Sequence, residues 1–108
     1  MENFTLRVLS ILIKMVYAVL LLDLKLTDCR SLKEKRSMLK PLLHKLHKEF
    51  NVSAVEVDKN DVWNESIIAC GLISNKKRAA ESCLAEIPGF LSKYFGEIEI
   101  LSYSIQFI

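Results

Sequence analysis

The clearest pattern along the chain is an alternation of apolar and other residues within residues 16–26. Leucines occupy the even positions from Leu20 to Leu26, and Asp23 and Lys25 stand between the last of them. A period of two is typical of a strand with one buried face. We therefore predict a first strand over residues 16–26.

The pattern then changes to a helical period. Ser31 and Glu34 have the spacing of a capping box, so a helix is expected to begin there and to run to about Phe50. Steps of about 100° place six apolar residues within one sector of roughly 100°: Leu32, Leu39, Leu42, Leu43, Leu46 and Phe50. Pro41 falls on the opposite, solvent side, which predicts a bend rather than a break.

The rest of the chain reads as a hairpin, a second helix and a last strand. A short β-branched segment at 52–57, turn residues at 58–61 and an apolar segment at 63–73 form the predicted hairpin. Ser74 or Asn75 caps the second helix, and Pro88 and Gly89 are expected to end it early. Its predicted inward face consists of Ala79, Ala80, Cys83, Leu84, Ile87 and Leu91.

In the last strand, residues 98–107, apolar residues change from even to odd positions, which predicts a bulge near Leu101. The resulting order is β-α-β-β-α-β. It predicts an α+β, ferredoxin-like split sandwich, with two helices on one face of a four-stranded antiparallel sheet. We assign residues 15–108 to this domain and residues 1–14 to an N-terminal extension, which is an added strand, an arm onto a partner or the product of an upstream start codon.

Both parities are apolar in the central strands, around Leu21 and around Ile67 to Ile73. The sheet face without helices is therefore expected to carry an apolar patch, which usually marks association. We predict a homodimer packed sheet to sheet. The alternative is that residues 1–14 cover the patch.

Composition narrows the class of protein. The chain has 108 residues, a net charge of +2 and three cysteines, which fit one domain in a reduced, cytoplasmic compartment. Arg7 and Lys14 interrupt the longest apolar stretch, so no membrane span, signal peptide or membrane partner is predicted. No disulfide framework, metal site or cofactor is expected.

The charge is unevenly placed. Residues 30–48 carry seven basic side chains and one acidic one, which points toward a polyanion. Cations collect where both helices begin, although the helix dipole disfavours them there by about 0.3–1 kcal/mol each. Treating the two preceding central strands as parallel, we expect both helix starts at one edge of the sheet, forming an anion- or nucleic-acid-binding site. Its predicted residues are Arg30, Lys33, Lys35, Arg36, Lys40, Lys76, Lys77 and Arg78.

A stripe along one flank of the first helix extends this edge: Lys33, Arg36, Lys40, His44 and His47. The predicted function is a non-enzymatic module that binds RNA or a ribonucleoprotein. The alternatives are a protein–protein adaptor whose sheet or basic flank meets an acidic partner, and an acylphosphatase-like phosphate-ester hydrolase. The hydrolase is disfavoured because the loop 27–31 lacks the glycines of a phosphate loop.

The segment Cys29-Arg30-Ser31-Leu32-Lys33-Glu34-Lys35-Arg36-Ser37, with Phe50-Asn51-Val52-Ser53 after it, resembles the YlxP-like family of small bacterial proteins. The resemblance covers about residues 15–105. It implies a ferredoxin-like fold and a suspected link to translation or RNA, and it supplies no mechanism.

Other candidates are weaker. Cys29 beside Arg30 is a conceivable nucleophile, but both histidines lie about 20 Å along the helix. His44 and His47 lack a third metal ligand. Acidic residues around the hairpin lack the spacing of a calcium loop, and Trp63 is more typical of packing than of base stacking.

Overall fold

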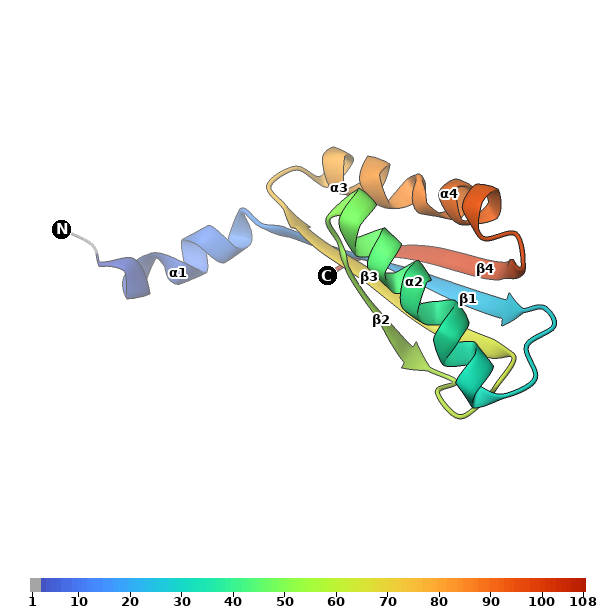
Figure 1. Ribbon diagram of the computed structural model, residues 1–108. Helices are drawn as coiled ribbons and strands as arrows, with labels where there is room; N and C mark the ends of the chain where they lie inside the picture. The colour runs from blue at the N-terminus through green and yellow to red at the C-terminus, as the bar shows by residue number, and fades with distance from the viewer. Residues whose placement is uncertain (1–2) are drawn as a thin grey trace.

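The computed structural model describes residues 3–108 and has the α+β, ferredoxin-like architecture (Figure 1). A four-stranded antiparallel sheet has the strand order β2-β3-β1-β4. Helices α2, α3 and α4 cover one face of it, and α1 projects away from the domain. The elements are α1 (Phe4–Ile13), β1 (Val16–Leu26), α2 (Leu32–Phe50), β2 (Ser53–Asp58), β3 (Glu65–Ser74), α3 (Lys77–Ala85), α4 (Ile87–Tyr94) and β4 (Ile98–Phe107).

The pairing of β1 with β4 contains the predicted bulge. Leu24 pairs with Ile100 and Asp23 with Ser102, so Leu101 is the extra residue. The bulge explains why apolar residues change parity along β4: because one residue is inserted, Ile105 pairs with Leu20 and lies on the same face of the sheet as Ile100, which pairs with Leu24.

The core lies between the sheet and the helices. On β1 every even position from Ala18 to Leu26 is buried, whereas Tyr17, Leu21 and Lys25 point to the face without helices. Leu42 and Leu46 of α2, and Leu84 of α3, are fully buried against this core. The alternation in the sequence therefore corresponds to the two faces of the sheet.

Helix α2 begins and ends as predicted. The Ser31 hydroxyl accepts a hydrogen bond from the Glu34 amide at 3.1 Å. Asn51 ends the helix in the left-handed region, with φ 52° and ψ 45°, a conformation that asparagine tolerates better than most residues. Pro41 lies inside the helix on the exposed side.

The predicted second helix is divided into α3 and α4. The break falls at Glu86, just before Pro88 in the first turn of α4. Proline is favoured there because it lacks the amide hydrogen that a helix start leaves unused. Ala79, expected on the inward face, is exposed, whereas Ala80, Leu84, Ile87 and Leu91 are buried.

The two strands of the hairpin begin and end within one or two residues of the predicted bounds. Trp63 lies in the turn before β3, which begins at Glu65, and Val52 is buried just before β2.

Of the predicted extension, residues 3–14 are described and form α1 and its C-cap Lys14, while residues 1 and 2 lie outside the described residues. The extension is a helix, not an added strand, and it does not cover the open face of the sheet (Figure 1). In residues 3–108, none of the helices has the length and apolar character needed to cross a membrane.

Candidate functional site: the groove between helix α2 and strand β2

The two basic helix starts lie at opposite ends of the domain, so the predicted common edge is wrong. Strands β1 and β3 are antiparallel neighbours: Lys25 pairs with Glu65 at one end, and Val16 pairs with Ser74 at the other. Because α2 follows β1 and α3 follows β3, their first turns point to opposite ends (Figure 1). Consecutive hairpin strands must run antiparallel, and the expectation of parallel central strands overlooked this constraint.

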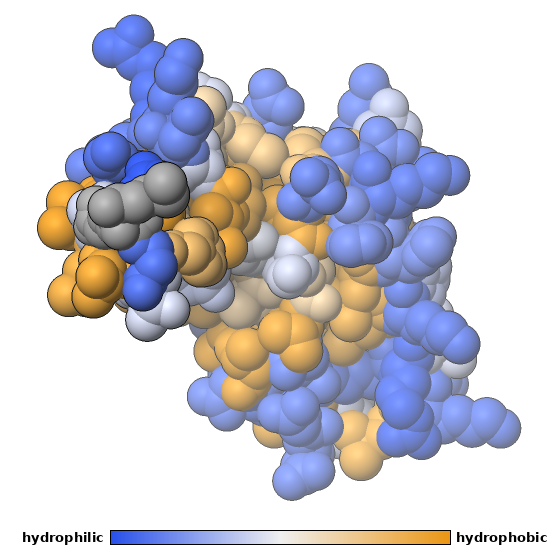
Figure 2. Space-filling model, turned by 90° about the vertical axis from the view of Figure 1, so that its left-hand side faces the viewer, coloured by the Kyte–Doolittle hydropathy of each residue, from blue (hydrophilic) through white to orange (hydrophobic). Residues whose placement is uncertain are grey.

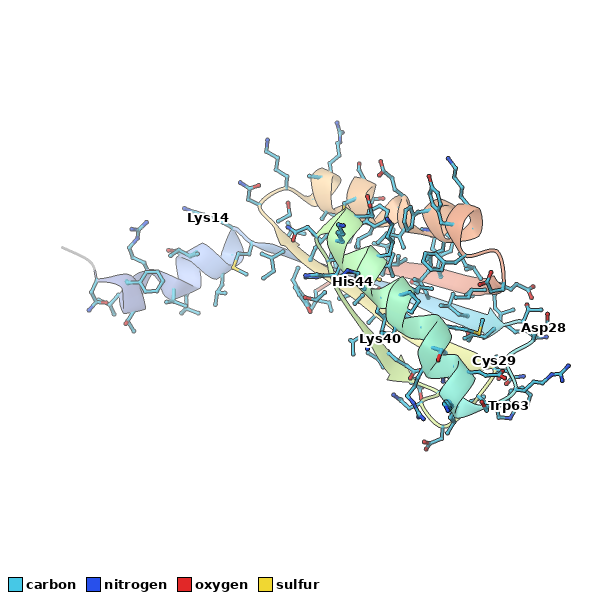
Figure 3. All side chains as sticks on the ribbon, in the orientation of Figure 1. Lys14, Asp28, Cys29, Lys40, His44 and Trp63 are labelled. Carbon is cyan, nitrogen blue, oxygen red and sulfur yellow. The ribbon has the colours of Figure 1, made fainter. Side chains whose placement is uncertain are left out.

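The eight predicted residues therefore form two separate groups. Arg30, Lys33, Lys35, Arg36 and Lys40 belong to the start and first half of α2, and Lys76, Lys77 and Arg78 belong to the start of α3. Figure 3 labels Asp28, Cys29 and Trp63 at the end of the domain where α2 begins.

Lys35 is not available to a ligand. Its side chain is 2% exposed, and its Nζ lies 2.7 Å from Glu56 Oε2. The same ammonium group donates hydrogen bonds to the carbonyl oxygens of Lys59 and Val62, at 2.7 Å each. Glu56 Oε2 also accepts a 2.6 Å hydrogen bond from the Ser66 hydroxyl. Lys35 thus connects α2 to β2 and to the turn between β2 and β3.

The amides at the start of α2 are also occupied. Glu34 Oε2 accepts a 2.8 Å hydrogen bond from the Arg30 amide, and the Ser31 hydroxyl accepts the Glu34 amide. The protein's own carboxylate therefore occupies the position where an anion would bind a helix N-terminus. The backbone amides of Arg30 and Glu34 are therefore not free to bind an anion, contrary to the prediction.

Cys29 has a structural role at the same end. Its thiol is buried and donates to the Trp63 carbonyl at 3.0 Å. This contact holds the segment before β3 against the loop that leads into α2 (Figure 3). Lys35 and Cys29 together dock the β2–β3 turn on the start of α2.

A groove of about 500 Å³ opens beside this contact, between α2 and the edge strand β2. Leu32, Leu39 and Leu43 form its apolar floor along α2, and Arg36 and Lys40 line it as well. On the opposite side, Glu56 and Asn60 line the groove.

The cations of the groove are free to meet a ligand. Arg36 and Lys40 are exposed and take part in none of the ion pairs found in residues 3–108. Glu56, the acidic residue that lines the groove, is engaged by Lys35. The site therefore combines an apolar floor with two uncompensated positive charges.

The predicted stripe continues along α2 beyond the groove. His44 is exposed, as is Lys40, and Figure 3 shows both midway along the helix. His47 Nδ1 lies 3.0 Å from the Val52 carbonyl oxygen. Across residues 3–108, no group of three His, Cys, Asp or Glu side chains is placed to hold a metal ion.

Strand β2 lies at the edge of the sheet, since its hydrogen-bonded neighbour is β3 and the strand order ends with β2. Its outer edge presents backbone amide and carbonyl groups to an incoming chain. A register shift between Glu56 and Asp58 limits the regular part of this edge to the first four residues of the strand.

A second surface is the open face of the sheet. Tyr17, Leu21, Val55 and Ile73 are exposed there, with Ile73 at 66%. At the α2 end of this face, Lys59 Nζ lies 3.1 Å from both Asp23 Oδ1 and Glu65 Oε1. These hydrogen bonds raise the pKa of Lys59.

Three comparisons place the chain among known proteins. A sequence profile described as "Protein of unknown function (DUF503)" matches residues 17–105. The chain is 35% identical over 72 residues to the "Uncharacterized protein YlxP" of Bacillus subtilis (strain 168), a match that covers 67% of this chain and 77% of that protein. The structure superposes on the "De novo designed protein Foldit4" with a TM-score of 0.51 and 14% identity, covering 87% of this chain and 96% of the design. The last likeness concerns the fold alone.

Proposed function

The chain belongs to the DUF503 family of YlxP, as its Ser31–Ser37 motif predicts, and from this premise we propose that it is a non-enzymatic binding module. Its ligand is an acidic, extended segment of another protein, held in the groove between α2 and β2. This is the adaptor alternative of the sequence analysis, with the basic flank of α2 as the binding surface.

One observation carries the proposal: the groove pairs an apolar floor with the unpaired cations Arg36 and Lys40 beside an open strand edge. An extended peptide that adds to an edge strand gains backbone hydrogen bonds there, and pockets for its alternate side chains give specificity. Leu39 and Leu43 would accept apolar side chains of such a peptide, and Arg36 and Lys40 would accept its carboxylates.

The groove favours protein over RNA. The RNA expectation needed both helix starts on one edge, and the antiparallel pairing of β1 with β3 separates them. A phosphate backbone gains little from a floor made of leucine side chains, whereas a peptide buries apolar groups there. The hydrolase alternative loses its anion position to the Glu34 carboxylate, which already accepts from the Arg30 amide.

The test is a binding titration with an acetylated heptapeptide of alternating valine and glutamate. The matched peptide replaces glutamate by glutamine, and a 20-nucleotide single-stranded RNA serves as the competing probe. We expect the acidic peptide to bind at least tenfold more tightly than its neutral counterpart, because each charge-assisted contact contributes about 1 kcal/mol or more.

Two variants locate the site. Arg36→Gln with Lys40→Gln should abolish this preference, whereas Lys76→Gln with Lys77→Gln, at the other end of the domain, should leave it unchanged. Equal binding of both peptides, or equal losses in both variants, would overturn the proposed groove. Salt-sensitive RNA binding that the α2 variant alone removes would replace the peptide with RNA as the ligand.

The apolar strip on the open sheet face supports a second, separate expectation, the homodimer. The exposed apolar residues lie on three neighbouring strands: Tyr17 and Leu21 on β1, Ile73 on β3 and Val55 on β2. A monomer rarely leaves a contiguous apolar strip in water.

A further inference from the structure

Helix α1 is an apolar helix without a partner in the domain. It has no buried residue, and Phe4, Leu9 and Ile13 are 75%, 75% and 83% exposed. Figure 2 shows hydrophobic side chains gathered on and around this helix, seen from its free end. A helix of ten residues is marginal in water by itself, so α1 needs an apolar surface to hold its conformation.

Apart from Thr5, the polar residues of α1 and its C-cap Lys14 lie in a narrow stripe. Steps of about 100° place Arg7, Ser10 and Lys14 within a sector of roughly 60°, and apolar residues fill most of the remaining circumference. No acidic residue occurs between Phe4 and Ile13. At about 15 Å in length, α1 is too short to span a bilayer, but its apolar side chains could enter the bilayer interface while its narrow basic stripe stays in water.

The second group of cations lies at the end of the domain where α1 is attached. Val16 pairs with Ser74, and Lys14 and Lys76 each lie two residues beyond this pair, no more than about 7 Å along the chain. Figure 3 shows Lys14 at this end. Because β1 and β3 are antiparallel, the cations at the start of α3 lie far from the start of α2 and close to α1.

Among the described residues, these cations have no carboxylate partner. Arg7, Lys14, Lys76 and Arg78 take part in none of the ion pairs that residues 3–108 form. Lys77 differs, since its Nζ lies 4.6 Å from the centre of the Phe107 ring. An apolar helix and an uncompensated positive cluster therefore share one end of the molecule.

We propose that this end binds an anionic lipid surface. Helix α1 lies in the interface with its apolar circumference among the acyl chains, and Lys14, Lys76 and Arg78 contact the phosphates of the headgroups. Clustered lysines and arginines beside an amphipathic helix are attracted to anionic bilayers in this way. A helix in a bilayer interface can bury a wide apolar arc and keep a narrow polar stripe in water. The flat face of another protein's sheet would cover only one side of α1.

The proposal is compatible with the lack of a spanning helix, because interfacial binding requires none. The family profile begins at residue 17, so lipid binding through α1 is a property of this chain's own extension. It uses no residue of the α2–β2 groove, and either proposal can fail without the other.

The experiment is co-sedimentation of the full chain with vesicles of phosphatidylcholine that contain phosphatidylglycerol, and with vesicles of phosphatidylcholine alone. We expect binding to the anionic vesicles that is at least tenfold stronger and that weakens at high salt. A chain beginning at Met15 should not bind, while its thermal unfolding stays within a few degrees of the full chain's, because α1 contributes no buried residue.

Two pairs of variants separate the apolar and charged contributions. Leu9→Gln should weaken binding about tenfold, whereas Ser10→Gln, on the polar stripe, should change it less than twofold. Lys76→Glu with Arg78→Glu should weaken binding to anionic vesicles more than tenfold, whereas Lys33→Glu with Arg36→Glu, at the far end, should weaken it less than threefold.

Equal effects of Leu9→Gln and Ser10→Gln, or unchanged binding by the chain that begins at Met15, would overturn the proposal. So would a full chain that self-associates through α1 without vesicles, since a second copy would then be the partner of this helix.

Discussion

Replacing Lys35 by methionine removes the buried ammonium group that ties α2 to the β2–β3 turn. Methionine keeps most of the volume of the lysine stem, so the change isolates the polar contacts from cavity formation. The substitution leaves Glu56 without its 2.7 Å partner and removes the donor of two 2.7 Å hydrogen bonds to the Lys59 and Val62 carbonyls.

The magnitude follows from the burial of the pair. Removing one partner of a buried ion pair destabilises a protein by about 3–5 kcal/mol. Glu56 retains 19% exposure and a hydrogen bond from Ser66, so its remaining charge is partly solvated. We therefore expect the free energy of unfolding to fall by about 3 kcal/mol, the lower end of that range.

Urea unfolding measures the loss, provided that the slope of free energy against urea is unchanged. Lys33→Met, two residues earlier and exposed, is the matched control and should stay within about 0.5 kcal/mol of wild type. Combining Lys35→Met with Glu56→Gln should cost less than the sum of the single changes, because each single change leaves one group unpaired. A loss below about 1 kcal/mol in Lys35→Met, or full additivity in the double variant, would refute the view that this pair holds the turn.

Three further predictions follow from other parts of the domain. Leu21→Lys, on the open sheet face, should shift sedimentation from dimer to monomer, and a wild type that is already monomeric at high concentration would contradict the predicted homodimer. Asn51→Ala should lower the melting temperature, with a loss of about 1 kcal/mol at the left-handed C-cap, whereas Asn51→Gly should change stability by only a few tenths. Burial raises the pKa of the Cys70 thiol to about 12, so its contribution to stability is complete below about pH 8.5, where the unfolded thiol is still protonated. Above that pH wild type should lose up to about 1.4 kcal/mol per pH unit more than Cys70→Ala, and parallel pH profiles of the two proteins would count against this thiol.

The fold was predictable because its signals are local. The alternating leucines of β1, the capping box at Ser31 and the change of parity at Leu101 each reflect a few neighbouring residues, and the structure confirms all three. Pro88 also marked the break between α3 and α4. The order of elements also implies that β3 runs antiparallel to β1. The predicted common edge for both helix starts is wrong because it assumed that these strands are parallel.

The candidate site was less predictable because its contacts join distant residues. A count of charges along the sequence does not distinguish the buried Lys35 from the exposed Lys33. The partners of Lys35 lie on β2 and in the turn that follows it. One signal was present: the same helical steps that define the inward leucines place Lys35 between Leu42 and Leu46 in angle, so a charge there needs a buried partner. The identity of Glu56 as that partner required the three-dimensional arrangement.

The pairing of β4 with β1 sets the order in which the sheet is completed during synthesis. β1 is synthesised before β4, yet β4 is one of its two neighbours in the sheet, and their pairing extends to Ala18 and Phe107. Until β4 has been synthesised, the nascent polypeptide displays one unpaired edge of this leucine-rich strand to other chains in the cell. A chain that lacks β4 would leave that edge of the strand permanently available for aggregation.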